Sequence, residues 1–446
     1  MGALLSGRGF SAPERREKRV KYKRFSTFGG GEGCLSASDG ANCDCSDGSI
    51  RPGLGLTAEI ADDYSSLVFL PDSFHAFPAD AGGEARLLAI NAQGRIYAFD
   101  GTEGEFVYLN HFFTLPVKAV NVYAADGSPR VAFCAGDGVW LYDGEDFTLA
   151  SDETSAVACA FHERLFVASA DAVHYSAPLD ASDFSDSADE GGYVRLPSAD
   201  GEIVSMQPLG EAVFLFRRRA ILRLEAGGAA RDFSVAMLGY EGGEILGVSD
   251  GAPGEKILFL ASDGLYAFDG KSAERICRDV SVLPGSGEVR FGRADGRRTV
   301  SYTDRSGTKR LLVLDGAAES AYFSSAPADA LSQTELGLLY AANGAVRGIG
   351  AGGSLPQGEE YEFSAENTDF GVSGRKFWKV LRLTGEGGCR VETESGGEKR
   401  SFSLTFENGE AAVFPLLSGE RFSLRLYLAS ASSAVTGAEL VFLTYA

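Results

Sequence analysis

The stretch that decides the fold is Arg95-Ile-Tyr-Ala-Phe-Asp-Gly101, a short apolar strand that ends in an Asp-Gly turn. The terminal glycines of this pattern and its later copies lie 43, 83, 43 and 46 residues apart, so the gap of 83 spans two periods. A copy that lacks the glycine is expected in that gap, near residues 173–178. The later copies occupy residues 139–144, 221–227 (degenerate), 265–270 and 311–316.

A second apolar strand precedes most copies of the pattern, for example at residues 86–90 and 130–134. A period near 43 residues with about four short strands is typical of a β-propeller blade. One such sheet cannot bury both of its faces, whereas sheets stacked around a ring cover one another and leave few open edges. We therefore expect an all-β chain in which residues 55–350 form a β-propeller of about seven four-stranded antiparallel blades.

The regions on either side of the propeller have different patterns. Residues 1–54 are predicted to be a basic N-terminal arm and lead-in segment, and the glycine-rich residues 351–358 a linker. After the linker, Phe422-Ser-Leu-Arg-Leu-Tyr-Leu428 alternates apolar and polar residues, which indicates a strand with one buried and one wet face. About seven such strands predict a C-terminal β-sandwich over residues 359–446.

The chain of 446 residues has a net charge of −21, and the charge is uneven. Residues 1–24 contain eight Lys or Arg and two Glu, a sum of +6, which leaves −27 for the rest. An acidic body repels duplex phosphates, so sequence-specific nucleic-acid binding is not expected.

The sequence predicts no membrane span and no signal peptide. Seven scattered cysteines without a C-x-x-C pair indicate reduced thiols and folding in a reducing cytosol.

Two short motifs match catalytic patterns without their required context. Gly348, Gly350 and Gly353 match the dinucleotide fingerprint, but Ser354-Leu-Pro-Gln-Gly follows where a helix is needed. Ser249 lies in a nucleophile-elbow string, but it leads into a strand and is interpreted as a turn residue. The four histidines have no metal-ligand spacing. We predict no catalytic, cofactor-binding or metal-binding residues, no cofactor and no enzymatic activity.

Three segments together resemble the β-propeller proteins of bacteriophage (or prophage) tails and head-to-tail junctions. The first runs from Phe28-Gly-Gly-Gly31 to Asp47-Gly-Ser-Ile-Arg-Pro-Gly53. The second includes Arg164-Leu-Phe-Val-Ala168 and Val173-His-Tyr-Ser-Ala-Pro178, and the third includes Thr368-Asp-Phe-Gly371. The first arginine of the family's Arg-x-Arg-Pro-Gly pattern is absent here.

The resemblance implies a non-enzymatic virion structural protein that acts as an assembly scaffold. Its partners would be other virion proteins (portal, adaptor or tail proteins) or further copies of itself in a ring. The protein would be located in the bacterial cytoplasm during assembly and then in the virion tail. The basic arm is expected to be unstructured by itself and to dock onto an acidic neighbouring subunit. The residues expected to bind this partner are Arg15, Arg16, Lys18, Arg19, Lys21, Lys23 and Arg24.

Two other classes of protein remain open at this point. A carbohydrate-binding propeller adhesin would expose an aromatic platform on the C-terminal domain, with Trp378 or Tyr427 as candidates, although Trp378 is better explained as a core residue. A propeller hydrolase or lyase would bring carboxylates or histidines with perturbed pKa values together in the central well.

Overall fold

The structure is a computed structural model of the 446-residue chain, and it describes most of the sequence. The termini of the described chain are Arg15 and Tyr445. Gly316, at the end of the predicted copy at residues 311–316, and the Phe28-Gly-Gly-Gly31 segment lie outside the described residues. The described ranges are 15–27, 34–37, 39–61, 71–78, 86–185, 191–197, 201–251, 254–278, 284–285, 287–314, 321–326, 330–334, 337–342, 345–370 and 372–445.

The chain divides into two compact units. One unit contains Leu54–Glu319 and Ser324–Gln357, and the other contains Met1–Gly53, Ser320–Phe323 and Gly358–Ala446. The first unit is close to the predicted propeller range of residues 55–350. The N-terminal segment differs from the expected separate arm, because it belongs to the same unit as the C-terminal strands.

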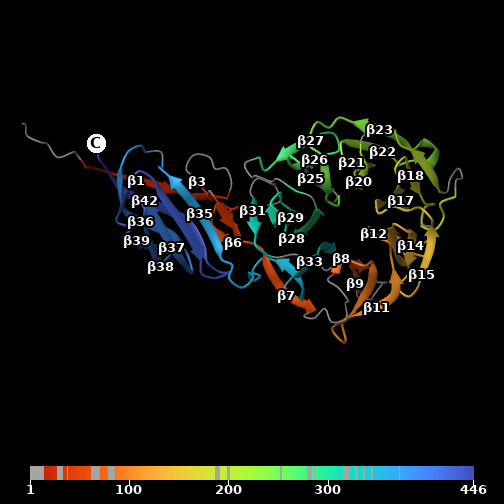
Figure 1. Ribbon diagram of the computed structural model, residues 1–446, viewed down its shortest axis with the longest axis horizontal. Coiled ribbons are helices and arrows are strands. Elements are labelled where there is room, and N and C mark those ends of the chain that lie inside the picture. Colours follow the sequence, from red (N-terminus) through yellow and green to blue (C-terminus); the bar gives the residue numbers. More distant parts are fainter. Residues whose placement is uncertain are drawn as a thin grey trace, which may run out of the picture. The chain divides into compact units, whose positions relative to one another are not determined.

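The first unit is a β-propeller whose described strands form seven blades around a central axis (Figure 1). Each of the first five blades is a four-stranded antiparallel sheet built from consecutive strands. Their strands are β8 (Pro71–Phe77), β9 (Arg86–Asn91), β10 (Arg95–Asp100) and β11 (Glu105–Phe112); β12 (Val117–Tyr123), β13 (Pro129–Ala135), β14 (Gly138–Tyr142) and β15 (Phe147–Ser151); β16 (Ala158–Phe161), β17 (Arg164–Ala168), β18 (Ala172–Tyr175) and β19 (Gly192–Arg195); β20 (Ile203–Leu209), β21 (Ala212–Arg217), β22 (Ala220–Glu225) and β23 (Ser234–Leu238); and β24 (Ile245–Val248), β25 (Ile257–Ala261), β26 (Gly264–Phe268) and β27 (Ala273–Ile276).

The last two blades complete the ring. Blade 6 contains β28 (Arg290–Ala294), β29 (Arg297–Thr303) and β30 (Lys309–Leu314). Blade 7 contains β32 (Ala330–Thr334), β33 (Gly337–Ala342) and β34 (Ala345–Gly350), and its outer strand is β7 (Gly55–Ala61) from the beginning of the propeller. In this way the first strand of the propeller closes the last blade, which ties the two ends of the ring together by backbone hydrogen bonds.

The sequence pattern corresponds to one position in the blades. The Asp-Gly segments at residues 95–101, 139–144 and 265–270 form the third strands β10, β14 and β26 and the turns that follow them. The glycine-free copy expected near residues 173–178 is the third strand β18. The second strands are almost completely buried, since they lie between two blade neighbours and are covered on both faces. Period and blade count therefore agree with the sequence prediction.

Two glycines of the dinucleotide-like string lie in a strand of the last blade. Gly348 and Gly350 belong to β34, inside the predicted propeller range of residues 55–350, and β34 pairs with β33 and β7. A Cβ atom at Gly348 would lie 2.5 Å from the Oγ1 atom of Thr57 on β7. The glycines at this position allow the closing strand to approach, so the segment is part of the ring closure.

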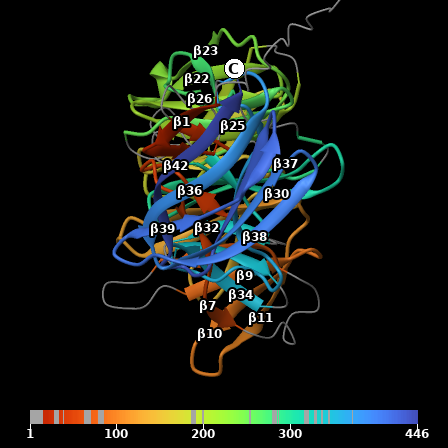
Figure 2. The same cartoon turned by 90° about the vertical axis from the view of Figure 1, so that its left-hand side faces the viewer.

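The second unit is a β-sandwich of two sheets, whose strands face the viewer in Figure 2. One sheet has the order β1-β42-β36-β39, with β40 also paired to β36; the other contains β31, β4, β35, β41, β37 and β38 in that order. The bounds are β1 (Arg15–Tyr22), β4 (Asp39–Ala41), β31 (Ala321–Ser324), β35 (Tyr361–Thr368), β36 (Lys376–Glu386), β37 (Gly388–Ser395), β38 (Glu398–Thr405), β39 (Glu410–Val413), β40 (Leu417–Gly419), β41 (Phe422–Leu428) and β42 (Ala434–Tyr445). Two smaller pairs, β2 (Arg24–Ser26) with β3 (Cys34–Ser36) and β5 (Cys43–Asp44) with β6 (Arg51–Pro52), complete the unit.

The core of the sandwich is aromatic. Trp378 is fully buried, and its ring centroid lies 4.8 Å from that of Phe442 and 5.0 Å from that of Phe422. Phe422 belongs to one sheet and Phe442 to the other, so Trp378 joins the two layers.

No helix in the described part of the chain has the length and apolar character needed to cross a membrane.

Candidate functional site

The first strands of successive blades contact one another around the ring, which makes them the innermost strands of the propeller. Five of these strands (β8, β12, β24, β28 and β32), together with neighbouring residues, line a central cavity of about 290 Å³. The lining combines apolar side chains such as Ile90 and Phe291 with charged and hydrogen-bonding ones such as Lys118, Asp250 and His75.

Lys118 and Asp250 form an ion pair in this cavity. Lys118 lies on β12 of blade 2, and Asp250 follows β24 of blade 5, 132 residues later. The Nζ atom of Lys118 is 3.1 Å from the Oδ1 atom of Asp250. Both side chains retain access to the cavity, with 39% and 64% of their surfaces exposed, although protein surrounds them. The pair joins two blades that are not neighbours in the ring.

Blade 4 holds the aspartate in place through Gln207. The Nε2 atom of Gln207 donates to the Oδ1 atom of Asp250 over 3.3 Å, and the amide of Gly251 donates to the Oε1 atom of Gln207 over 3.2 Å. A Cβ atom at position 251 would lie only 2.4 Å from the carbonyl oxygen of Pro208. Glycine is therefore required directly after Asp250 for this close approach between β20 and the end of β24.

A second polar pair, His75 and Asn121, joins blades 1 and 2. The Nε2 atom of His75 lies 2.7 Å from the Oδ1 atom of Asn121. Burial lowers the pKa of His75 to about 4, and the hydrogen bond to Asn121 only partly opposes this effect. The imidazole is therefore neutral at pH 7.

The charges of the cavity are fixed near neutral pH. The neighbouring Asp250 carboxylate raises the pKa of Lys118, and the Lys118 ammonium lowers the pKa of Asp250. General acid–base catalysis works best when a pKa lies close to the operating pH. The pKa values of all three side chains are shifted away from pH 7. The cluster is therefore suited to hydrogen bonding and charge pairing rather than to proton transfer.

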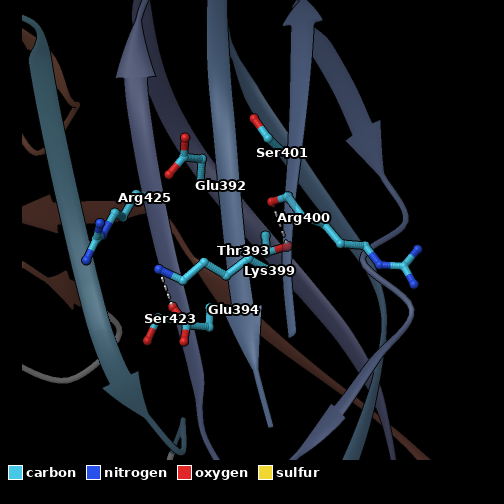
Figure 3. Close-up of a pocket in the computed structure, with 8 residues that line it drawn as sticks. All are labelled: Glu392, Thr393, Glu394, Lys399, Arg400, Ser401, Ser423 and Arg425. Carbon is cyan, nitrogen blue, oxygen red and sulfur yellow. Dashed lines mark hydrogen bonds and ion pairs between the residues drawn. The ribbon is translucent and has the colours of Figure 1, made fainter. Parts of the chain in front are cut away.

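A second pocket, of about 240 Å³, lies on the outward face of β37, β38 and β41 in the sandwich (Figure 3). The Nζ atom of Lys399 is 3.2 Å from the Oε2 atom of Glu394. In Figure 3 the Lys399 ammonium points toward Glu394 and Ser423, whereas Arg400 extends away from the other labelled side chains. Arg425 is paired with Glu366 of β35. This is a solvated, charged sheet face.

The aromatic platform that a carbohydrate-binding sandwich would need is not formed by the two predicted residues. Trp378 has no exposed surface, and its Nε1 atom donates to the Oγ atom of Ser395 over 3.0 Å. Tyr427 is buried, and the guanidinium carbon of Arg390 lies 3.8 Å from the centre of its ring. The prediction of Trp378 as a core residue is confirmed.

The predicted basic arm is an edge strand. Residues 15–22, expected to be unstructured by themselves, form β1 and pair with β42 along their whole length, from Arg15 opposite Tyr445 to Tyr22 opposite Ala438. The expectation was wrong here because it considered only the run of charge and not the apolar strand that the arm can join.

Part of the positive charge of β1 is neutralised within the chain. Lys21 pairs with Glu439 of β42 at 3.3 Å, and Arg19 pairs with Glu17 at 3.1 Å. Glu17 also accepts a hydrogen bond from Lys379 of β36. The seven predicted partner-binding residues are brought together on or beside this strand, where all of them are exposed: Arg15, Arg16, Lys18, Arg19, Lys21, Lys23 and Arg24.

Ser249, the residue in the nucleophile-elbow string, has a structural environment. Its amide donates to the carbonyl of Leu258, and its hydroxyl accepts from the amide of Leu258 over 2.9 Å.

Within the described ranges, no three His, Cys, Asp or Glu side chains are grouped closely enough to hold a metal ion.

The outer edge of the propeller carries an unusual set of side chains. Among the described residues, six of the nine large hydrophobic side chains that are exposed lie on the outermost strands of blades 1 to 4. We call this surface the apolar arc. Its members are Val107, Tyr108 and Phe112 on β11, Leu149 on β15, Tyr193 on β19 and Met237 on β23.

The outer strands of the arc also carry little charge. The segments Phe147–Ser151 and Ser234–Leu238 contain no charged residue, whereas β27 of blade 5, with sequence Ala-Glu-Arg-Ile, contains two in four positions. Open strand edges are usually protected by charged residues, because unpaired backbone groups favour association with other chains. The arc lacks this protection on β15 and β23.

Comparisons with known proteins bear on the fold alone. Neither a protein-family model nor a curated protein sequence matches the chain. Among solved structures, one similar structure is the crystal structure of BBS1N in complex with ARL6DN, soaked with lead. It is 13% identical with a TM-score of 0.46, and the match covers 70% of this chain and 100% of that one.

Sequence reasoning missed both the cavity cluster and the apolar arc. Lys118, Gln207 and Asp250 are far apart in the chain, and only the closed ring brings them together. A charged residue within the apolar run of an innermost strand, such as Lys118 between Val117 and Ala119, was the available signal. For the arc, the signal was the absence of charge in the fourth strand of a repeat.

Proposed function

We propose that this protein is a non-enzymatic structural component of a phage or prophage virion, of the tail hub or head-to-tail junction, that acts as an assembly scaffold. In this proposal it binds other virion proteins through the apolar arc of its propeller. It is made in the bacterial cytoplasm and becomes part of the virion tail. The phage context is supported by the resemblance of the three sequence segments.

The apolar arc is the observation that carries this proposal. Phe112, Met237 and Leu149 are 63%, 52% and 44% exposed. Large apolar side chains that are exposed on strands with little charge are available to a partner that spans these strands. Full burial of one such side chain contributes roughly 1.5–3 kcal/mol, so a partner that covers several of them gains a stable interface.

The architecture supports a scaffold in a second way. β7 closes blade 7 through backbone pairs such as that between Leu56 and Ile349, so the ring has no free end. A closed ring presents its outer strands at fixed positions. A partner that docks on the arc therefore meets a surface that needs little reorganisation, which lowers the entropic cost of binding.

The central cavity is also consistent with a protein that binds rather than catalyses. Its charged residues, Lys118 and Asp250, have pKa values shifted away from neutrality by each other. The hydrolase alternative needs groups that exchange protons near neutral pH.

The test is the composition of assembled particles. The gene would be replaced in its host genome by a variant with Leu149→Lys and Met237→Lys, and particles would be purified and analysed by mass spectrometry. The wild-type protein should be present in fixed stoichiometry and the double variant strongly depleted. A matched variant with Glu274→Lys on β27 should be incorporated normally. Absence of the wild-type protein from particles, or equal incorporation of the arc variant, contradicts the proposal.

A further inference from the structure

Contacts among the described residues use only part of the hydrogen-bonding capacity of the Lys118–Asp250 pair. The Oδ1 atom of Asp250 receives the hydrogen bonds from Lys118 and Gln207. Asp250 lines the cavity, and among the described residues its hydrogen bonds use only Oδ1, which leaves its second carboxylate oxygen available as an acceptor. The Lys118 ammonium has three N–H donors and gives one of them to Asp250. A ligand in the cavity therefore meets a donor and an acceptor side by side.

The formal charges around the cavity are already balanced. Lys118 neutralises Asp250, and Arg290 on β28 is 2.7 Å from Glu288. His75 is neutral and is engaged with Asn121. A charged ligand would have to compete with one of these internal pairs for its counter-charge. An uncharged ligand can bond to both members of the Lys118–Asp250 pair and leave the pair intact.

The remaining lining matches a molecule with polar edges and apolar faces. Ile90, Val117, Val248 and Phe291 present apolar surfaces to the cavity. Hydroxyl groups both donate and accept, so two adjacent hydroxyls satisfy an ammonium and a carboxylate at the same time. The C–H faces of a polyhydroxylated ring can lie against the apolar side chains. The cavity volume of about 290 Å³ is near the lower limit of typical ligand sites, roughly 300–1,000 Å³, which suits one small ring.

From this geometry we propose that the central cavity of the propeller is a binding site for a neutral, polyhydroxylated small molecule of the size of one sugar ring, held by two adjacent hydroxyls between Lys118 and Asp250. The site is distinct from the apolar arc and does not depend on the proposed virion role. It is also separate from the C-terminal sandwich, where the sequence analysis placed a carbohydrate-binding alternative.

Isothermal titration calorimetry and saturation-transfer NMR on the full-length protein test this proposal. The probes are glucose, galactose, mannose, ribose and myo-inositol, with acetate and inorganic phosphate as charged counterparts. At least one neutral probe should bind at millimolar concentration. Asp250→Asn should weaken this binding about tenfold, because hydrogen bonds to charged groups are stronger than those to neutral ones.

A double variant, Lys118→Met with Asp250→Leu, removes the pair without leaving an unpaired charge, and it should abolish the binding. The matched control is Lys399→Met with Glu394→Leu, which removes the comparable pair from the pocket on the sandwich sheet and should leave binding unchanged. Thermal unfolding of each variant shows that it is folded. The proposal is overturned if no neutral probe binds, if the cavity variants bind as well as the wild type, or if acetate or phosphate binds in place of the neutral probes.

Discussion

The innermost and outermost strands of the propeller differ in a way that reverses the usual distribution of polar and apolar residues. The innermost strands place an ion pair, Lys118 with Asp250, and the His75–Asn121 pair around the central cavity. The outermost strands of blades 1 to 4 place Phe112, Leu149 and other large apolar side chains on the surface. Between them, the second strands are buried and almost entirely apolar.

This difference teaches that the apolar core of each blade is built mainly by its middle strands. Buried polar groups and exposed apolar groups both cost free energy unless they are paired or covered. In the cavity the polar groups are paired across blades. On the outer edge nothing in the same strands covers the apolar side chains, and this is the reason to assign the edge to a partner.

The largest effect is expected from breaking the ring, because both surfaces depend on it. Leu56 on β7 is buried and lies opposite Ile349. Leu56→Asp places an unpaired charge in the closing strand and should lower the free energy of unfolding by about 3 kcal/mol or more. Urea denaturation followed by circular dichroism measures the change. Glu59 lies on the same strand as Leu56 and forms a partly exposed ion pair with Arg347 on β34, so Glu59→Gln should cost less than about 1 kcal/mol. Equal effects of the two variants would contradict the role of β7 as the closing strand.

A smaller effect is expected from titrating the inner surface. His75 has a folded pKa of about 4, below the unfolded value near 6.5, so between these values the unfolded state binds more protons. Stability should therefore fall as the pH falls from 6.5 to 4, by about 3 kcal/mol from this residue. The measurement is the difference between wild type and His75→Gln in urea denaturation across this range. A constant difference over the whole range would show that His75 is not buried in its neutral form.

The charge pair of the cavity should contribute less. A double-mutant cycle of Lys118→Met and Asp250→Asn should give a coupling free energy of about 1 kcal/mol or less, because the cavity leaves both side chains open to water. Lys118→Met alone should also cost no more than about 1 kcal/mol, because the Asp250 carboxylate that loses its counter-charge remains open to water. A coupling free energy well above this value would contradict the solvated character of the pair.

The smallest effect on stability is expected at the outer edge. Leu149→Lys and Met237→Lys should each change the free energy of unfolding by no more than about 0.5 kcal/mol, because both side chains are exposed. The same substitutions should reduce any self-association measured by sedimentation velocity, since they add charge to uncharged strand edges. A large loss of stability would mean that these side chains belong to the core of the propeller.

The repeat was predictable from the sequence because its determinants are local. An apolar strand followed by Asp-Gly, as in residues 95–101, fixes a hairpin wherever it occurs, and its period gives the number of blades. Pairings between distant segments were not predictable in the same way. The pairing of β1 with β42 and the place of Gly348 in the closing blade depend on which strand edges remain open after the ring and the sandwich form.

The functional surfaces were harder to predict for the same reason. Neither Lys118 nor Asp250 belongs to a recognisable sequence motif. Their side chains come into contact only because the blades close into a ring. Trp378 was correctly predicted as a core residue because it lies within a predicted strand, near Val380 and Arg382. No local sequence pattern shows which outermost strands leave their apolar side chains exposed. The apolar arc could therefore be recognised only in the structure.

Site-specific photo-crosslinking tests the central claim most directly. A photoreactive phenylalanine analogue would be incorporated at Met237 on the arc and, in a separate variant, at Glu274 on β27, in a host that assembles particles. The account predicts that the Met237 position crosslinks to one defined virion protein in purified particles and that the Glu274 position does not. If the two positions give the same products, or if Met237 gives none while the protein is present in particles, the apolar arc is not the docking surface.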